Sequence, residues 1–305
     1  MNKTEHKQNI YRMIFVLITM LLWGSLYPMA KLAFSMYNVN DVPDIFLFAG
    51  IRFTICGMVI AVYALFKSPK SYAPAKSALI PILLSGLFSI ILQYSFNYLG
   101  LLHIDSSKSA ILKQVGVIFY VCFSALFFKN DRLTWRKLIG VILGFTGIIA
   151  INLSSDGISF HPGDLAIIAA SFSTIFANIV SKKVFVLVDP ITATGISQLF
   201  GGLVLSLVGI IMGGNITIAF DASIWCLVYI CAASSISYCL WYWVVKFGEL
   251  SKLFIFKFAE PLFASILGAI ILHENIWQLQ YLSSFILIAA GIWISNSTSR
   301  KNKKL

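Results

Sequence analysis

The chain has 305 residues, of which 59% are hydrophobic and only 11% are charged. Soluble domains average about 25% charged residues, so this composition excludes a soluble globular protein. The net charge of +11 comes from basic residues scattered between apolar segments, which excludes the dense basic face of a nucleic-acid binder.

Ten apolar segments follow one another along the chain. A spanning helix needs about 20 mostly apolar residues, because its backbone polar groups must be satisfied within the segment. The predicted spans are 11–36, 45–66, 78–99, 106–128, 136–153, 163–185, 191–212, 222–245, 251–272 and 277–296. Since the connections are short, the sequence predicts an all-α integral membrane protein without a soluble domain.

The charges between the spans predict the orientation of the protein. Alternate connections, beginning with the N-terminal one, carry most of the 23 lysine and arginine residues. The other connections carry acidic residues instead, such as Asp41, Asp44 and Asp156. Because cytoplasmic loops are enriched in lysine and arginine, we expect a multi-pass protein of the cell membrane with both termini in the cytoplasm.

An internal repeat relates the two halves of the chain. Shifting the sequence by 144 residues places "YSFNYLGLLHIDSSKSAILK" over "YCLWYWVVKFGELSKLFIFK" without a gap. The shift pairs residues of the same kind, among them Tyr94 with Tyr238, Tyr98 with Tyr242, and Lys113 with Lys257. Each copy holds five spans, an odd number, so the copies insert in opposite orientations, as in many transporters. The predicted units are 11–153 and 163–296, two inverted five-helix repeats around a central cavity.

Three stretches carry a recognisable pattern: "WGSLYPMAK" at 23–31, "GDLAIIAASFSTIFANIVSKK" at 163–183 and "AEPLFASILGAIILHE" at 259–274. Together with the ten spans and the repeat, they resemble the EamA family of the drug/metabolite transporter superfamily over nearly the full length. The resemblance implies a ten-helix basket in which helices 1, 3, 4, 6, 8 and 9 surround a central cavity, with helices 5 and 10 outside. The first copy departs from the pattern, since Val117 stands in place of Pro261 and Asn130 in place of Glu274.

Glu260 is the only acidic residue well inside a predicted span. A charge at mid-membrane costs about 2.5–3.5 kcal/mol on insertion scales, so it needs a partner or a function. Two interpretations stay open: a structural pair with Lys257 on the same helix face, or a cavity residue that binds a cationic group or exchanges a proton. The repeat mates Lys113 and Lys257 are either matched gate elements or snorkelling side chains. Pro261 removes a helix hydrogen bond and is expected to kink the helix or to act as a hinge.

Aromatic and amide residues gather on the predicted cavity helices. On two of these helices they recur at i, i+3 and i+4, which places them in one stripe. Such a stripe lines a pocket for an aromatic, aliphatic or quaternary ammonium group, or else forms an interfacial belt or packs in the core. Lys31 and Arg52 are expected to pair with outer-loop acids or helix C-termini, with a direct role in substrate binding as the alternative. The expected substrate-binding residues are Trp23, Tyr27, Tyr94, Asn97, Tyr98, Lys113, Gln114, Asn178, Tyr238, Trp241, Tyr242, Lys257 and Glu260.

The leading functional interpretation is a secondary transporter of small metabolites, an amino acid or a related amphiphile, with efflux favoured and alternating access as the mechanism. The alternative is uptake of choline or another organic cation through an aromatic-lined site with Glu260. We find no HExxH, GxSxG or phosphate-binding motif, so an enzyme is not expected. The expected partners are a small-molecule substrate, the lipid bilayer, and protons or an exchange substrate, with a homodimer left open. No cofactor, metal ion or nucleic acid is expected.

Overall fold

A computed structural model describes the chain over residues 3–67, 76–104, 109, 112–129, 131, 133–152, 161–218, 222–272 and 279–296. These residues form twelve α-helices and one π-helical stretch. Two of the predicted spans are each divided into shorter helices, so the elements make up ten helical segments. Seven segments are long and apolar enough to cross a membrane. The predicted all-helical membrane fold is therefore confirmed.

Each half of the chain contributes five of the ten segments. The first half holds α1 (Lys3–Met36), α2 (Val42–Lys67), the continuous run of α3 (Lys76–Gly86), η2 (Leu87–Leu92) and α4 (Gln93–His103), then α6 (Gln114–Phe127) and α7 (Trp135–Asn152). The second half holds α8 (Pro162–Val184), α9 (Pro190–Ile211), α10 (Ala222–Phe247), the pair α11 (Leu250–Phe256) and α12 (Ala259–Leu272), and α13 (Leu279–Asn296). The described residues leave out 106–108, 110 and 111, at the start of the predicted fourth span. They also leave out Asn130 and Glu274.

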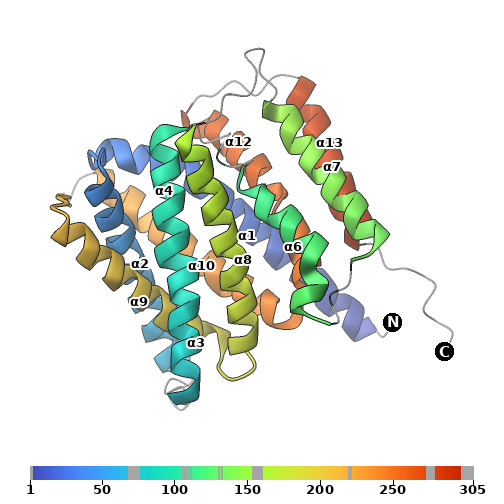
Figure 1. Cartoon of the computed structure of the whole chain (residues 1–305), viewed down its shortest axis with the longest axis horizontal. Helices are drawn as coiled ribbons and strands as arrows, with labels where there is room; N and C mark the ends of the chain where they lie inside the picture. Colours follow the sequence, from blue (N-terminus) through green and yellow to red (C-terminus); the bar gives the residue numbers. More distant parts are fainter. Residues whose placement is uncertain are drawn as a thin grey trace.

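The two halves run in opposite directions through the molecule. In Figure 1, α1 starts at the lower rim and ends at the upper rim, whereas α8, which opens the second half, runs from the upper rim to the lower one. The pair α2 and α9 lies at one side and the pair α7 and α13 at the other, with α1, α4, α8 and α10 between them. The odd number of spans in each copy produces this inversion, as the repeat predicted.

Local sequence signals set the starts of α8 and α9, the first two helices of the second half. The His161 side chain accepts a hydrogen bond from Gly163 N at 3.1 Å, and the Asp164 carboxylate accepts one from His161 N at 2.8 Å. This is a capping box, which satisfies backbone N–H groups that have no partner within the helix. Helix α9 starts in a related way, with Asp189 as its N-cap followed by Pro190 at the first helical position.

Helices α7 and α13, the fifth and tenth segments, pack against each other with small residues at their interface. A Cβ atom on Gly140 would lie 2.8 Å from the carbonyl oxygen of Gly291, so the two backbones approach closely. Ser284 adds a hydrogen bond from its hydroxyl to the carbonyl oxygen of Gly147. Small residues allow such close helix packing in membranes. The position of these helices at one side agrees with the outside place that the family resemblance implies.

The ninth segment is interrupted at Lys257 and Phe258, between α11 and α12. Pro261 has no N–H to offer the carbonyl of Lys257, and that carbonyl instead accepts a hydrogen bond from Glu260 N at 3.0 Å. Lys257 N bonds the carbonyl of Phe254 at 2.9 Å, so the chain makes a tighter turn here than in an α-helix. The interruption agrees with the kink predicted from Pro261, while a hinge motion stays a prediction.

A buried polar cluster around Asp131 joins the connection between α6 and α7 to the start of α11. The Asp131 carboxylate lies 2.8 Å from Lys137 Nζ and accepts hydrogen bonds from Ser251 N at 3.0 Å and from the Ser251 hydroxyl. Tyr120 donates to it at 3.3 Å, and Lys137 also pairs with Glu249 at 3.4 Å. The cluster therefore ties together two connections that lie on the same rim as the chain start in Figure 1.

We expect Asp131→Asn to lower the free energy of unfolding by about 3 kcal/mol at pH 7, because it leaves the buried Lys137 without its closest carboxylate. Burial by itself raises the pKa of the Asp131 carboxyl, but hydrogen bonds from Lys137 and Ser251 outweigh burial and hold the pKa below its ordinary value. Because the folded-state pKa is depressed, this stabilisation is complete above the unfolded-state pKa of about 3.9 and is lost as the pH falls through the folded-state pKa.

The measurement is the melting temperature of the detergent-solubilised protein between pH 7 and pH 3, for the wild type and Asp131→Asn. The difference between the two should be largest at pH 7 and should shrink below about pH 3.9. Asp41→Asn, at an exposed residue of another connection, is the control and should leave the curve unchanged. A difference that stays constant over this range would contradict the titration of Asp131.

Candidate functional site

A central cavity lies among the helices of both halves and encloses about 590 Å³ of space between protein atoms, its opening included. The helices that line it are α1, α2, α4, α8 and α10, together with the interrupted ninth segment and the residue just before α6. Its lining residues are Trp23, Leu26, Tyr27, Ala30, Arg52, Gln93, Tyr94, Asn97, Tyr98, Leu101, Lys113, Thr174, Asn178, Tyr238, Trp241, Tyr242, Lys257 and Glu260. Twelve of the thirteen residues expected from the sequence to bind substrate are therefore brought together here.

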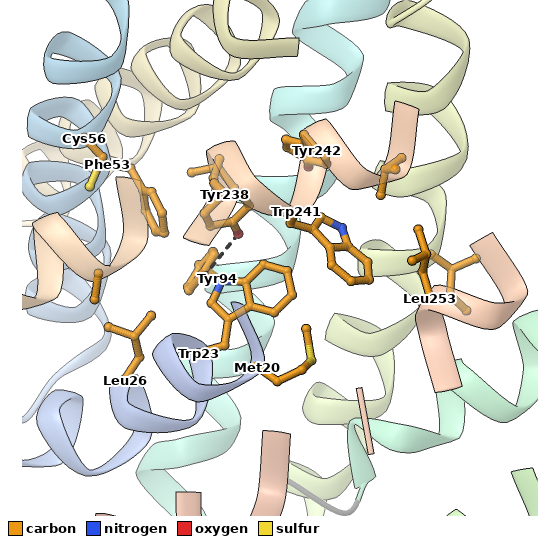
Figure 2. Close-up of a cluster of buried hydrophobic side chains, with 14 of the residues drawn as sticks. Met20, Trp23, Leu26, Phe53, Cys56, Tyr94, Tyr238, Trp241, Tyr242 and Leu253 are labelled. Atoms are coloured by element: carbon orange, nitrogen blue, oxygen red, sulfur yellow. Dashed lines mark hydrogen bonds between the residues drawn. The ribbon is translucent and has the colours of Figure 1, made fainter. Parts of the chain in front are cut away.

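One wall of the cavity is aromatic. Figure 2 shows the ring of Trp23 facing Tyr238 and Trp241, and the ring centroids lie 5.7 and 5.2 Å from that of Trp23. Tyr94 and Tyr238, which are repeat mates, join their hydroxyl groups at 3.2 Å. All four rings are buried in the protein, so these stripes do not form a belt that faces the membrane interface. The two copies of the repeat thus meet at the cavity.

Asn178 fixes the orientation of the aromatic wall from helix α8. Its side-chain oxygen accepts a hydrogen bond from Trp241 Nε1 at 2.6 Å, while its nitrogen donates to the carbonyl of Thr174 at 2.7 Å. These two bonds also assign the amide orientation. Since an indole N–H needs a partner when it is buried, Asn178 holds Trp241 in place at the cavity wall.

Glu260 lies in an ion pair that crosses between the halves. Its Oε1 atom is 3.4 Å from Lys113 Nζ, and it accepts a hydrogen bond from the Tyr27 hydroxyl at 3.1 Å. Lys113 Nζ also lies 3.1 Å from the Tyr27 oxygen. The three side chains form a largely buried triad in which Lys113 from the first copy neutralises Glu260 from the second.

This arrangement corrects the structural interpretation of Glu260. One of the two open interpretations was a pair with Lys257, three residues away on the same helix face, but the helix is interrupted between these residues. The Lys257 ammonium instead lies over the rings of Trp23 and Trp241, 4.4 and 4.9 Å from their centroids. No salt bridge links Lys257 to a carboxylate within the described part of the chain. Lys257 is therefore stabilised by cation–π contacts.

Arg52 is the main residue that sequence reasoning misplaced. We expected it to pair with outer-loop acids or helix C-termini, with a substrate role only as the alternative, but it lies in the cavity lining and is only 1% exposed. Its guanidinium donates to the Ser234 hydroxyl, at 3.1 Å from Nε and 2.6 Å from Nη2, and to the Tyr98 hydroxyl. The second helix therefore joins the six cavity helices that the family resemblance implied. The sequence signal that could have placed Arg52 in the cavity is its position as a basic residue deep inside an apolar span.

The remaining predicted residues divide between this cavity and a neighbouring one. Tyr242 and Asn97 line the central cavity, whereas Gln114 lines a smaller space of about 260 Å³ that shares Lys113, Lys257 and Glu260 with it. Besides Arg52, five lining residues fell outside the expected set. Nothing in their type marks out Leu26, Ala30, Leu101 and Thr174, whereas Gln93 belongs to the aromatic and amide residues that gather on the predicted cavity helices. Among the described residues, no group of His, Cys, Asp or Glu is arranged to hold a metal ion.

An inverted-repeat helical bundle with a central, charged and aromatic cavity defines a polytopic membrane transporter. The chain matches the model of the EamA-like transporter family over residues 11–153 and 161–297, and it belongs to that family. It is 27% identical over 292 residues to the uncharacterized transporter YvbV of Bacillus subtilis strain 168, covering 93% of this chain and 90% of that one.

Other relatives agree with this assignment. The chain is 23% identical over 283 residues to the uncharacterized inner membrane transporter YedA of Escherichia coli K12, covering 90% of this chain and 87% of the relative. A solved crystal structure is similar to it with a TM-score of 0.77 at 19% identity, covering 94% and 96% of the two chains, which supports the fold alone. The protein is thus a multi-pass membrane transporter and not an enzyme.

Proposed function

We propose that the protein is a secondary transporter that moves a small amphiphilic metabolite, an amino acid or a closely related compound, by alternating access. The observation that carries this proposal is the contact between the repeat mates Tyr94 and Tyr238 in the cavity, where their hydroxyls lie 3.2 Å apart. A cavity built at the junction of inverted copies suits alternating access, because the copies differ in sequence and exchange conformations.

The chemistry of the cavity supports an amphiphilic substrate. Trp23, Tyr238 and Trp241 offer apolar ring surface, while Arg52, Glu260 and other polar groups lie in the same lining. Small-molecule sites commonly combine apolar walls with a few placed polar groups. A compound with one hydrophobic side chain and one charged end fits both features.

Uptake of choline or another organic cation is supported less well. A quaternary ammonium needs ring faces or a carboxylate to bind to. The Trp23 and Trp241 rings already lie against the Lys257 ammonium, and Glu260 is already paired with Lys113. A cationic substrate would have to displace both lysines from their partners.

We further propose that both termini face the cytoplasm, that transport is outward, and that protons or an exchanged solute drive it. The basic residues in alternate connections support the orientation, since cytoplasmic loops are rich in lysine and arginine. The family resemblance motivates the outward direction and the substrate class.

The test is counterflow in liposomes that contain the purified protein. The panel consists of neutral aromatic and aliphatic amino acids, choline and a divalent organic cation, with protein-free liposomes as the control. We expect counterflow of at least one neutral amino acid and none of choline. Counterflow of the cations alone would replace the proposal with the alternative function.

A further inference from the structure

The charges that line the central cavity do not balance. Arg52, Lys113 and Lys257 line it together with a single carboxylate, that of Glu260, among the described residues. Lys113 is paired with Glu260 at 3.4 Å. The cavity lining therefore holds two more positive charges than negative ones. A buried charge is costly unless it is paired, so this site favours a ligand that brings negative charge.

Arg52 is the cation whose surroundings are best suited to receive such a ligand. Its hydrogen-bond partners, Ser234 and Tyr98, are neutral hydroxyls, and its guanidinium lies over the rings of Phe53 and Tyr94 at 4.8 and 5.3 Å from their centroids. No carboxylate pairs with it within the described part of the chain. A guanidinium has five N–H donors, and the described contacts use three of them.

The contacts of Arg52 also hold its guanidinium in place before any ligand binds. Ser234 is on α10 and Tyr98 on α4, so the side chain is fixed from two helices besides its own. A planar, preorganised guanidinium matches the two oxygens of a carboxylate and loses little freedom on binding. Lysine ammonium groups lack this planar fork, which is why we assign the acidic group to Arg52 and not to Lys257.

A second donor points to the same kind of ligand. The indole Nε1 of Trp23 is buried at the cavity and has no hydrogen-bond partner among the described residues. The side-chain oxygen of Asn97 is the one acceptor in the cavity lining that is buried without a partner in the described structure. Together with the two N–H groups of Arg52 that the described contacts do not use, the spare donors outnumber this one buried acceptor, which suits an anionic group.

We infer that the substrate carries a free carboxylate and that Arg52 binds it. The inference rests on the proposed function, because it assigns the chemical group that the same cavity holds during transport. It separates ligands by one functional group: amino acids and other small organic acids bind more tightly than the corresponding amides.

The experiment measures binding to the purified protein in detergent by calorimetry. Leucine and leucinamide, and likewise phenylalanine and phenylalaninamide, differ only at the acidic group, whereas 4-methylpentanoate and 3-phenylpropanoate keep the carboxylate and lack the amine. In 2-phenylethylphosphonate, a phosphonate replaces the carboxylate of 3-phenylpropanoate. We expect each carboxylate to bind about 10- to 100-fold more tightly than its amide, the range of one charge-assisted hydrogen-bonded pair. Equal binding of acid and amide, no binding of any carboxylate, or preference for the phosphonate would overturn the inference.

Variants then assign the discrimination to Arg52. Arg52→Gln is expected to bring the ratio of acid to amide binding close to one, and Arg52→Lys to restore part of it. Lys31→Gln removes a positive charge from α1 outside the cavity lining and is expected to leave the ratio unchanged. An unchanged ratio in Arg52→Gln would overturn the assignment. If Arg52→Gln does not fold, the ratio of acid to amide binding is compared between the wild type and Arg52→Lys. An equal ratio in these two proteins would overturn the assignment to Arg52.

The outcome also separates this inference from the proposed function. Binding of 4-methylpentanoate and 3-phenylpropanoate without binding of either amino acid would refute an amino acid substrate and leave the carboxylate assignment intact. Binding of both amino acids and both amides alike would keep the proposed function and refute the role of Arg52.

Discussion

Glu260→Gln is expected to reduce counterflow at least about tenfold and to lower the melting temperature of the protein. The side chains of Lys113 and Glu260 are 15% and 3% exposed, so the pair is largely shielded from water. Removing one partner of a buried pair costs about 3–5 kcal/mol, because it leaves the other charge without compensation. The cost should lie near the lower end, since Lys113 keeps some exposure and its contact with the Tyr27 hydroxyl.

The coupling between the two residues gives the sharper test. We expect the double variant Lys113→Gln with Glu260→Gln to be about 1–3 kcal/mol more stable than the sum of the two single changes predicts. The exposed pair of Lys252 and Glu249, 3.0 Å apart and 41% and 42% exposed, is the matched control and should show a coupling below about 1 kcal/mol. Additive effects of Lys113→Gln and Glu260→Gln would mean that the ion pair does not hold the halves together.

The same variant addresses the energy source. If Glu260 carries a proton, flux by the wild type depends on a pH gradient and flux by Glu260→Gln does not. Flux that ignores the gradient in both proteins would exclude Glu260 as the proton carrier. It would leave exchange of one solute for another as the driving process.

Gly57→Leu is expected to prevent α2 and α9 from packing and to leave little folded protein. A Cβ atom on Gly57 would lie 2.3 Å from Leu199 N, and one on Gly202 would lie 2.3 Å from Thr54 N. Both contacts are with backbone atoms, which cannot rotate away as a side chain can. We therefore place the cost at the upper end of overpacking, at about 3 kcal/mol or more.

Val59→Leu is the matched control for this change. Val59 lies on the same helix but is 56% exposed, so a larger side chain there meets no packed backbone. The measurement is the fraction of monodisperse protein after size-exclusion chromatography, together with its melting temperature. We expect Val59→Leu to match the wild type. If Gly57→Leu also matched it, the close approach of α2 and α9 would be wrong.

The sequence by itself determined the membrane fold of this protein. Membrane-spanning helices are determined by local composition, because a backbone in lipid must satisfy its hydrogen bonds within a segment of about 20 residues. The shift of 144 residues that aligns Tyr94 with Tyr238 then gave the inverted halves, and the hydroxyls of these two residues meet in the structure. Most of the cavity lining followed from the positions of aromatic and amide residues on helix faces.

Only the tertiary structure decided which charges are paired. Helix periodicity placed Lys257 beside Glu260, but Pro261 interrupts the helix and turns Lys257 toward the rings of Trp23 and Trp241. The partner of Glu260 is Lys113, 147 residues away, and Arg52 bonds Ser234, 182 residues away. In a low-dielectric interior, a buried charge is stabilised by the polar groups that the packed helices bring close to it. Which groups these are depends on the distances between helices, and a local sequence pattern does not determine those distances.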